Sequence, residues 1–195
     1  MGFIPGRTFR MGSEAHYPEE APEHDVTVSG FWIDRHPVTN HEFRQFVEET
    51  GYVTSAEKPA RAEDYPGAVP EMLVPSSVVF QKPRGVVDMR SHYNWWAYVP
   101  GASWRHPQGP NSSLKGLADH PVVHVAYEDA LAYAIWAKKE LPTEAEWELA
   151  ARGGLEGMEY AWGSELSPGG RIVANTWQGE FPHKKRKHKK FEWTS

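Results

Sequence analysis

Apolar residues recur at helical spacing in three stretches, and the first of them follows residue 39. Residues spaced three and four apart lie on one side of an α-helix. In this stretch they are Phe43, Phe46 and Val47. Thr39 and Glu42 have the spacing of a capping box, in which each side chain accepts a hydrogen bond from the other residue's backbone N–H. Because Gly51 can supply the left-handed residue that ends many helices, we expect a helix between Thr39 and Gly51.

The most strongly patterned stretch covers residues 120–154, where the sequence predicts a short strand and two helices. Three valines favour the strand over residues 120–125. The second helix would bury four residues at helical spacing, Ala130, Tyr133, Ala134 and Ala137. The third would start at a capping box of Thr143 and Glu146 and end at Gly153. Its expected buried face consists of Trp147, Ala150 and Ala151.

The rest of the chain combines short strand patterns with turns. Strand-like composition occurs in four pieces, residues 8–11, 26–28, 31–34 and 77–80. Prolines interrupt residues 58–120 and exclude long helices there. With 17 glycines and 16 prolines among 195 residues, the sequence predicts an α+β fold with short strands, two or three helices and low regular secondary structure.

Charge separates the body of the chain from its C-terminal end. The last thirteen residues hold six of the 21 Lys and Arg residues but one of the 26 acids. Residues 1–182 therefore carry 15 bases against 25 acids, a net charge of −10. An acidic body of this kind argues against nucleic-acid binding. The sequence has neither an apolar run long enough for a membrane span nor a signal peptide, so we expect a cytoplasmic protein without a membrane partner.

The basic residues at the end define a separate segment. We expect residues 1–182 to form one domain and residues 183–195 to form a tail, in which residues 183–190 are disordered because like charges oppose compaction. Two origins of this tail are open. It could be a polyanion-binding patch, or it could come from a disrupted or spliced reading frame.

Side chains with catalytic potential have structural explanations in this sequence. His120 and His124 on one strand would lie roughly 13 Å apart, which is too far to share a metal ion. Three acids, Glu144, Glu146 and Glu148, fall in the first turns of a predicted helix, where negative charge favours the helix dipole. Cysteine is absent. The sequence therefore contains no disulfide, thiolate metal site or cysteine nucleophile.

An aromatic run is the main candidate for binding. It contains Tyr93, Trp95, Trp96, Tyr98 and Trp104. These rings could form a satellite core beneath long loops. They could equally line a groove for a peptide or another extended ligand, because flat rigid rings give contact area at low entropic cost.

Several motifs in order resemble one family. They are IPGRTFRMGSE (4–14), FWIDRHPVTNHEFRQFV (31–47), TGYVTSAEK (50–58), GASWRHPQGP (101–110), HPVVHVAYEDALAYAIWA, LPTEAEWELAARGG, AWG (161–163) and ANTWQGEFP (174–182). Together they resemble the formylglycine-generating enzymes, or sulfatase-modifying factors, over nearly all of residues 4–182. The resemblance implies a loop-rich mixed fold related to the C-type lectin-like domain.

The resemblance also implies an activity for the family. Its enzymes bind copper(I) through a cysteine pair and oxidise a sulfatase cysteine to formylglycine, and those cysteines lie in a C-terminal portion that this chain does not contain. We therefore expect no catalytic residue and no copper site here. Three functions are open: an incompletely represented enzyme, a non-catalytic paralogue or peptide-binding module, and an inactive truncated product.

The C-terminally incomplete match has an expected structural consequence. Apolar residues would lose their cover, among them Val122, Val125, Trp136, Trp162 and Trp177. We therefore expect self-association through exposed apolar surface.

The resemblance assigns two candidate sites. Trp104 matches a segment near the family's substrate groove, so Trp104, Arg105, Trp95 and Trp96 are the candidate contacts with a sulfatase peptide. Asn175, through its side chain, and Thr176, through its carbonyl, match part of the family's calcium site. Lys189 stands where the family has an aspartate and cannot ligate calcium, so half of that site is kept and calcium binding is not expected.

Overall fold

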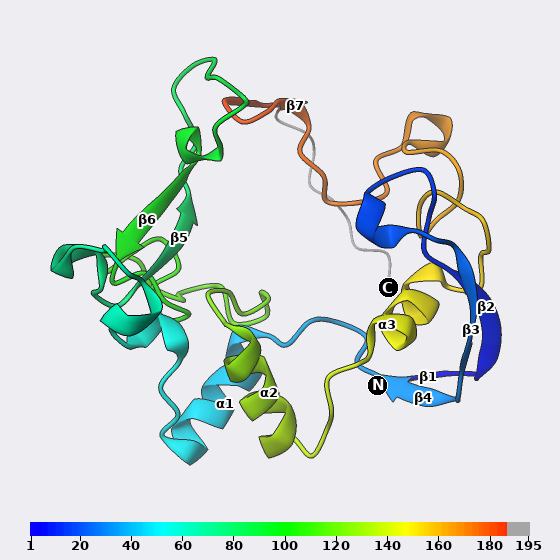
Figure 1. Ribbon diagram of the computed structural model, residues 1–195, viewed down its shortest axis with the longest axis horizontal. Helices are drawn as coiled ribbons and strands as arrows, with labels where there is room; N and C mark the ends of the chain where they lie inside the picture. The colour runs from blue at the N-terminus through cyan, green and yellow to red at the C-terminus, as the bar shows by residue number, and fades with distance from the viewer. Residues whose placement is uncertain (187–195) are drawn as a thin grey trace. The chain divides into compact units, whose positions relative to one another are not determined.

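A computed structural model describes residues 1–186. The chain divides into two compact units, each described here by itself. The first unit contains Met1–His36 and Pro142–Thr176, and the second contains Pro37–Leu141 and, among the described residues, 177–186. Residues 1–186 form three α-helices, short antiparallel strand pairs and several turns of 3-10 helix (Figure 1). This confirms the predicted loop-rich α+β fold.

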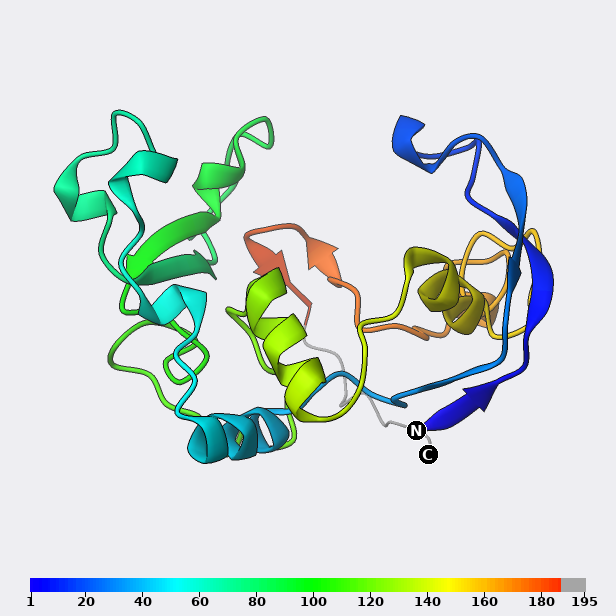
Figure 2. The same cartoon turned by 60° about the horizontal axis from the view of Figure 1, so that its bottom comes forward.

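Two antiparallel strand pairs and one helix make the first unit. Strand β1 (Gly2–Ile4) pairs with β4 (Phe31–Ile33), and β2 (Arg7–Met11) pairs with β3 (His24–Val28). Helix α3 (Glu144–Arg152) packs against β2 and β3 (Figure 2). The strands and the helix are therefore joined by one small core. Its buried residues are Phe9, Val28 and Leu149.

Helix α3 has the predicted ends but a different buried face. Thr143 and Glu146 form the expected capping box, and Gly153 ends the helix with φ 57°. Leu149 is 2% exposed in the core, whereas Trp147 is 61% exposed. Residues two apart on a helix are rotated by roughly 200° about its axis, so their side chains point to nearly opposite sides. Because Leu149 faces the β2–β3 pair, Trp147 faces solvent, and the prediction that Trp147 is buried was wrong.

The core of the second unit forms where two helices meet. Helices α1 (Asn40–Thr50) and α2 (Tyr127–Trp136) contact each other. The predicted capping box of α1 is present, and Gly51 ends the helix with φ 67°. The buried core residues are Phe43, Phe46, Val47, Trp104 and Tyr133. The predicted apolar stripe of the first helix is therefore confirmed.

Two strand hairpins complete the second unit. Strand β5 (Ser76–Phe80) pairs with β6 (Trp96–Pro100). Strand β7 (Gly179–Glu180) pairs with β8 (Lys184–Lys185). Single turns of 3-10 helix punctuate both units, at Pro18–Glu20, Ser55–Glu57, Ala62–Asp64, Pro70–Met72, His92–Asn94 and Pro168–Gly170. None of the helices in residues 1–186 is long and apolar enough to cross a membrane.

The strand predicted over residues 120–125 does not form. Pro121 makes one isolated antiparallel bridge with the residue that precedes α1. His124 then adopts a left-handed backbone with φ 58°. Its ring nitrogens lie 2.8 Å from the Ser77 hydroxyl and 2.9 Å from the Pro107 carbonyl oxygen. These two contacts turn the chain away from an extended path.

The start of the basic tail is also structured. Residues 183–186 belong to the described part of the chain, and Lys184 and Lys185 form β8. The Lys184 Nζ lies 2.9 Å from a Glu180 carboxylate oxygen. This opposite charge offsets the repulsion on which the prediction of a disordered arm from residue 183 rested. The rest of that predicted arm, residues 187–190, lies outside the described residues.

The exposed apolar residues differ from those expected from the sequence. The five residues expected to lose cover, Val122, Val125, Trp136, Trp162 and Trp177, are all half-buried. The indole N–H of Trp136 donates to a Glu49 carboxylate oxygen at 3.0 Å. Large side chains that are more than 60% exposed include Trp32, Tyr127, Ile135 and Trp147.

Candidate functional site

A carboxylate links two of the predicted groove residues. The Trp104 indole N–H donates to Glu57 Oε2 at 3.2 Å, and Arg105 Nε donates to Glu57 Oε1 at 3.1 Å. The Arg105 guanidinium lies over the Trp104 ring, with Cζ 4.4 Å from the ring centroid. Trp104 itself is fully buried. The half-exposed guanidinium of Arg105 is therefore held in place by its stacking on Trp104 and by its bond to Glu57.

The local structure around Glu57 explains why it can hold Arg105. Glu57 ends a 3-10 turn, and its carboxylate accepts from the N–H and the hydroxyl of Thr54 at 3.1 and 2.8 Å. Burial opposes ionisation, but the hydrogen bonds from Thr54 and Arg105 outweigh it and hold the pKa of Glu57 below its usual value. The group is therefore an anion at neutral pH that orients the cation of Arg105.

The other two groove residues lie at the β5–β6 hairpin. Val78 pairs across the strands with Tyr98, and Phe80 pairs with Trp96. Cross-strand partners point to the same side of a sheet. These four residues form what we call the aromatic face, in which Val78, Trp96 and Tyr98 are 49%, 39% and 51% exposed. The hairpin therefore offers an apolar surface to solvent.

The aromatic face is supported from below by rings from the C-terminal hairpin. Phe80 lies 5.5 Å from Trp96 and 5.8 Å from Trp177, measured between ring centroids. Trp95 is buried and packs edge-on against Phe181 at 5.4 Å. Trp95 thus supports the face, whereas Trp96 is part of it.

The four predicted groove residues form two groups. Trp104 and Arg105 contact Phe43 and Glu57, whereas Trp95 and Trp96 contact Phe80 and Phe181. Trp96 begins β6, and Trp104 follows the end of that strand. At about 3.3 Å per residue, β6 spans roughly 13 Å. A ligand that reaches both groups would therefore be extended along the hairpin.

Two contributors to this region were not predicted as site residues. The Thr54–Glu57 spacing resembles a capping box, which would have marked Glu57 as a local structural residue. Its bonds to residues near position 104 join parts of the chain 47 and 48 positions apart. The sequence gives no signal for such a pairing, nor for the packing of Phe181 beneath Trp95.

The predicted metal ligands lie at the end of the first unit. Asn175 and Thr176 are both exposed, and the Thr176 N–H donates to the Ala174 carbonyl at 2.8 Å. Within residues 1–186 no three His, Asp or Glu side chains gather as a metal cluster. Calcium takes six to eight oxygen ligands. The two donors here do not complete such a set, and Lys189 lies outside the described residues.

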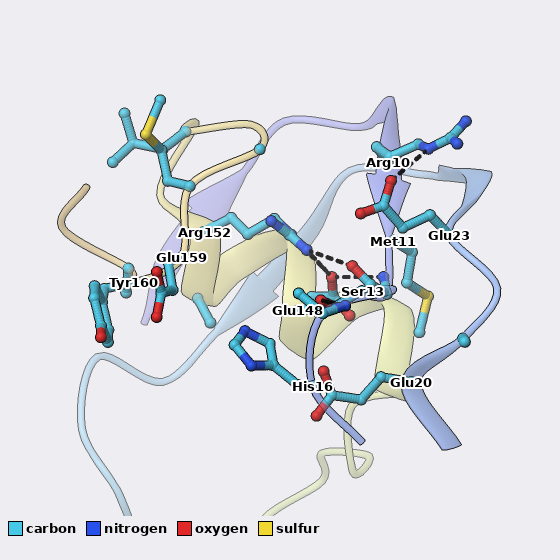
Figure 3. A pocket seen from close by; sticks show the side chains of 18 of the residues that line it. Arg10, Met11, Ser13, His16, Glu20, Glu23, Glu148, Arg152, Glu159 and Tyr160 are labelled. Carbon is cyan, nitrogen blue, oxygen red and sulfur yellow. Dashed lines mark hydrogen bonds and ion pairs between the residues drawn. The ribbon is translucent and has the colours of Figure 1, made fainter. Parts of the chain in front are cut away.

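The first unit contains a pocket that the sequence did not predict. Its volume is about 830 Å³, and it is lined by β2, the loop that follows it, α3 and residues 155–161 (Figure 3). Glu148 accepts from the Gly12 N–H at 3.1 Å and from Arg152 Nε at 2.9 Å. These bonds fasten the loop after β2 to helix α3 and shape one wall of the pocket.

The charge of this pocket is negative. Arg152 is paired with Glu148, and Arg10 is paired with Glu23. Further carboxylates on the wall belong to Glu19, Glu20, Glu144 and Glu159. A hydrogen bond to Glu159 raises the pKa of Tyr160, which keeps that phenol protonated. The lining also includes the Ser13 hydroxyl, which accepts a hydrogen bond from the Ala15 N–H at 3.1 Å, and the His16 ring.

Comparison with known proteins places the chain in a family. A family model for the sulfatase-modifying factor enzyme 1-like domain matches residues 1–194. The formylglycine-generating enzyme of Mycobacterium tuberculosis is 56% identical over 181 residues, which cover 93% of this chain and 60% of that protein. The formylglycine-generating enzyme of Mus musculus is 43% identical over 182 residues, covering 92% of the chain and 46% of that protein.

A further relative carries a name that denotes loss of activity. The mouse protein named inactive C-alpha-formylglycine-generating enzyme 2 is 42% identical over 186 residues, covering 93% of this chain and 56% of that protein. The chain thus spans between 46% and 60% of the length of these three relatives. The two formylglycine-generating enzymes are thus similar to this chain over 93% and 92% of its length. Together with the match of the family model to residues 1–194, this shows that the chain belongs to the sulfatase-modifying factor family.

Proposed function

We propose that the second unit binds a cysteine-containing sulfatase peptide along the β5–β6 hairpin, and that this chain does not itself oxidise the cysteine. The observation that carries the proposal is the aromatic face, because three of its four residues are between 39% and 51% exposed although they are apolar. The description of the matching family as a sulfatase-modifying factor domain supports a sulfatase peptide as the ligand class.

The shape of the aromatic face suits an extended peptide. Trp96 and Tyr98 present flat rings with few rotatable bonds, so contact costs little side-chain entropy. Within the face, the Phe80 ring packs against Trp96, and Trp177 packs against Phe80 from below, which supports the Trp96 ring. A peptide of about four residues would match the roughly 13 Å span of β6.

Arg105 would contact the far end of the same peptide. Its Nε is occupied by Glu57, and within residues 1–186 its Nη atoms make no hydrogen bond to the protein. A guanidinium fixed in this way can donate to a peptide carbonyl or a carboxylate without first losing its own freedom. Trp104 would act indirectly, by supporting Arg105 through the stacking contact.

The proposed lack of oxidation rests on ligand chemistry. Copper(I) is held by soft thiolate ligands, and the sequence contains no cysteine. Any cysteine pair would have to come from outside this sequence. The similarity to a protein named as inactive supports the proposed lack of oxidation.

Calcium independence and a cytoplasmic location belong to the same proposal. Asn175 and Thr176 offer too few oxygen ligands for calcium. Removing calcium with a chelator should leave the melting temperature of the purified chain unchanged, and a drop of several degrees would contradict this. Cell fractionation would test the location.

A labelled peptide gives the test of binding. A fluorescent peptide of the Cys-x-Pro-x-Arg type should bind the chain, and the double variant Trp96→Ala/Tyr98→Ala should bind it at least about tenfold more weakly. Tyr93→Ala is the matched control, because Tyr93 is 79% exposed but lies outside the strands. With copper and oxygen added, no aldehyde should form. Equal binding by all three proteins, or aldehyde above a copper-only control, would overturn the proposal.

A further inference from the structure

Helix α2 carries a second apolar stripe on the side that does not enter the core. Tyr133 and Ala134 are buried, while Tyr127, Leu131 and Ile135 are 68%, 36% and 67% exposed. The spacing of four residues places these three side chains along one side of the helix. A helix of ten residues that is apolar on two sides needs a second partner to cover the outer one.

The exposed stripe is symmetric about its middle residue. Tyr127 and Ile135 each lie four residues from Leu131, which is about 6 Å along the helix axis in either direction. A second α2 that packs antiparallel, with the two-fold axis at Leu131, would bring Tyr127 beside Ile135 of the second copy. The stripe is therefore complementary to itself.

Charges at the two ends select the antiparallel arrangement. Glu128 is exposed in the first turn of α2, and Lys138 is exposed just beyond its last turn. Lys138 has a left-handed backbone with φ 56° and lies outside the helix. In the antiparallel pair, the first turn of α2 with Glu128 faces the last turn of the second copy, so Glu128 and Lys138 of the second copy come to the same end of the contact. A parallel pair would instead place Glu128 beside Glu128.

We propose that this chain forms a two-fold symmetric dimer in which α2 packs antiparallel against α2 of a second copy, with Leu131 on the axis. A contact made by one short helix buries less surface than a standard stable interface. The dimer is therefore weak and concentration-dependent. The residues that form it are separate from the aromatic face, so the peptide-binding proposal can fail while this one holds.

Cysteine cross-linking tests the geometry directly, because the natural chain has no cysteine. Leu131→Cys should form a disulfide or short bismaleimide dimer at least about tenfold faster than Val86→Cys, which replaces a side chain that is 84% exposed in the same unit. A mixture of Tyr127→Cys and Ile135→Cys should give chiefly the mixed dimer.

Charge exchange tests the identity of the partner. Glu128→Lys and Lys138→Glu should each weaken dimerisation in sedimentation equilibrium, and the double variant should restore it, because both copies then carry the exchanged pair. Ile135→Glu should abolish the dimer, and circular dichroism would confirm that each variant keeps its helices. Cross-linking of Leu131→Cys no faster than of Val86→Cys, or a double variant as monomeric as the single ones, would show that a second copy does not cover this face.

Discussion

The Tyr52 hydroxyl donates a hydrogen bond of 3.1 Å to Oδ1 of Asp129, a residue that has no exposed surface. Asp129 also accepts from the Ser55 N–H at 3.0 Å and from the Ala126 N–H at 2.8 Å. It therefore joins the first turn of α2 to the 3-10 turn that ends at Glu57. The orientation of Arg105 depends in this way on a buried carboxyl group on another element.

Removing this carboxyl group should destabilise the second unit. In Asp129→Ala several buried donors would lose their acceptor, and each buried donor without a partner costs about 1–3 kcal/mol. We expect a loss of about 3 kcal/mol or more in the free energy of unfolding, measured by urea denaturation. Asp119→Ala, at an exposed position, is the control. A loss below about 1 kcal/mol would show that Asp129 does not hold the turn.

The raised pKa of Tyr52 predicts how the stability of the protein changes at high pH. Burial, followed by the hydrogen bond to Asp129, raises the pKa of Tyr52 above its usual value of 10.0. A pKa that is raised in the folded state gives stability that is complete below the unfolded value and is lost as pH rises through the folded one. The free energy of unfolding should therefore fall above about pH 10, and Tyr52→Phe should lessen that fall. An identical pH dependence in both proteins would contradict the assignment.

The lowered pKa of Glu57 predicts a loss of stability at low pH. Burial favours its neutral form, yet the hydrogen bonds from Thr54 and Arg105 lower its pKa below 4.5. Its contribution is present above the unfolded pKa and is lost as pH falls through the folded one. Glu57→Gln should cost about 1–2 kcal/mol at neutral pH and make the acid dependence shallower. Chemical denaturation between neutral pH and pH 3 measures both effects, and a variant as stable as the parent at neutral pH would refute them.

Two neighbouring residues on α3 should differ strongly in their effect. Leu149→Ala removes a core side chain and should cost about 2–5 kcal/mol. Trp147→Ala changes a residue that is 61% exposed and should cost about 0.5 kcal/mol or less. The free energies of unfolding of the two variants would settle which face of the helix is buried. A larger loss for Trp147→Ala would reverse the assignment.

The features predicted correctly depend on residues close together in sequence. The capping boxes at Thr39 and Thr143 involve partners three positions away. The glycines that end the two helices, Gly51 and Gly153, come directly after the last helical residue. The first helix also has a clear apolar stripe. Such local signals specify where these elements begin and end.

The features that were missed depend on distant parts of the chain. The rotation of α3 is set by its contact with β2 and β3, which lie more than 100 residues earlier. His124 leaves the extended conformation because its ring contacts a hydroxyl 47 residues away. The link between Glu57 and Trp104 spans the same separation. A single sequence holds no local pattern that reports these pairings.

Hydrogen–deuterium exchange with and without a Cys-x-Pro-x-Arg peptide tests the central claim most directly. Binding along the hairpin should slow amide exchange in β5, in β6 and around Arg105, while the peptide is recovered with its cysteine unchanged. The first unit should exchange equally in both samples. Protection confined to the first unit, or no protection at saturating peptide, would contradict the proposed site.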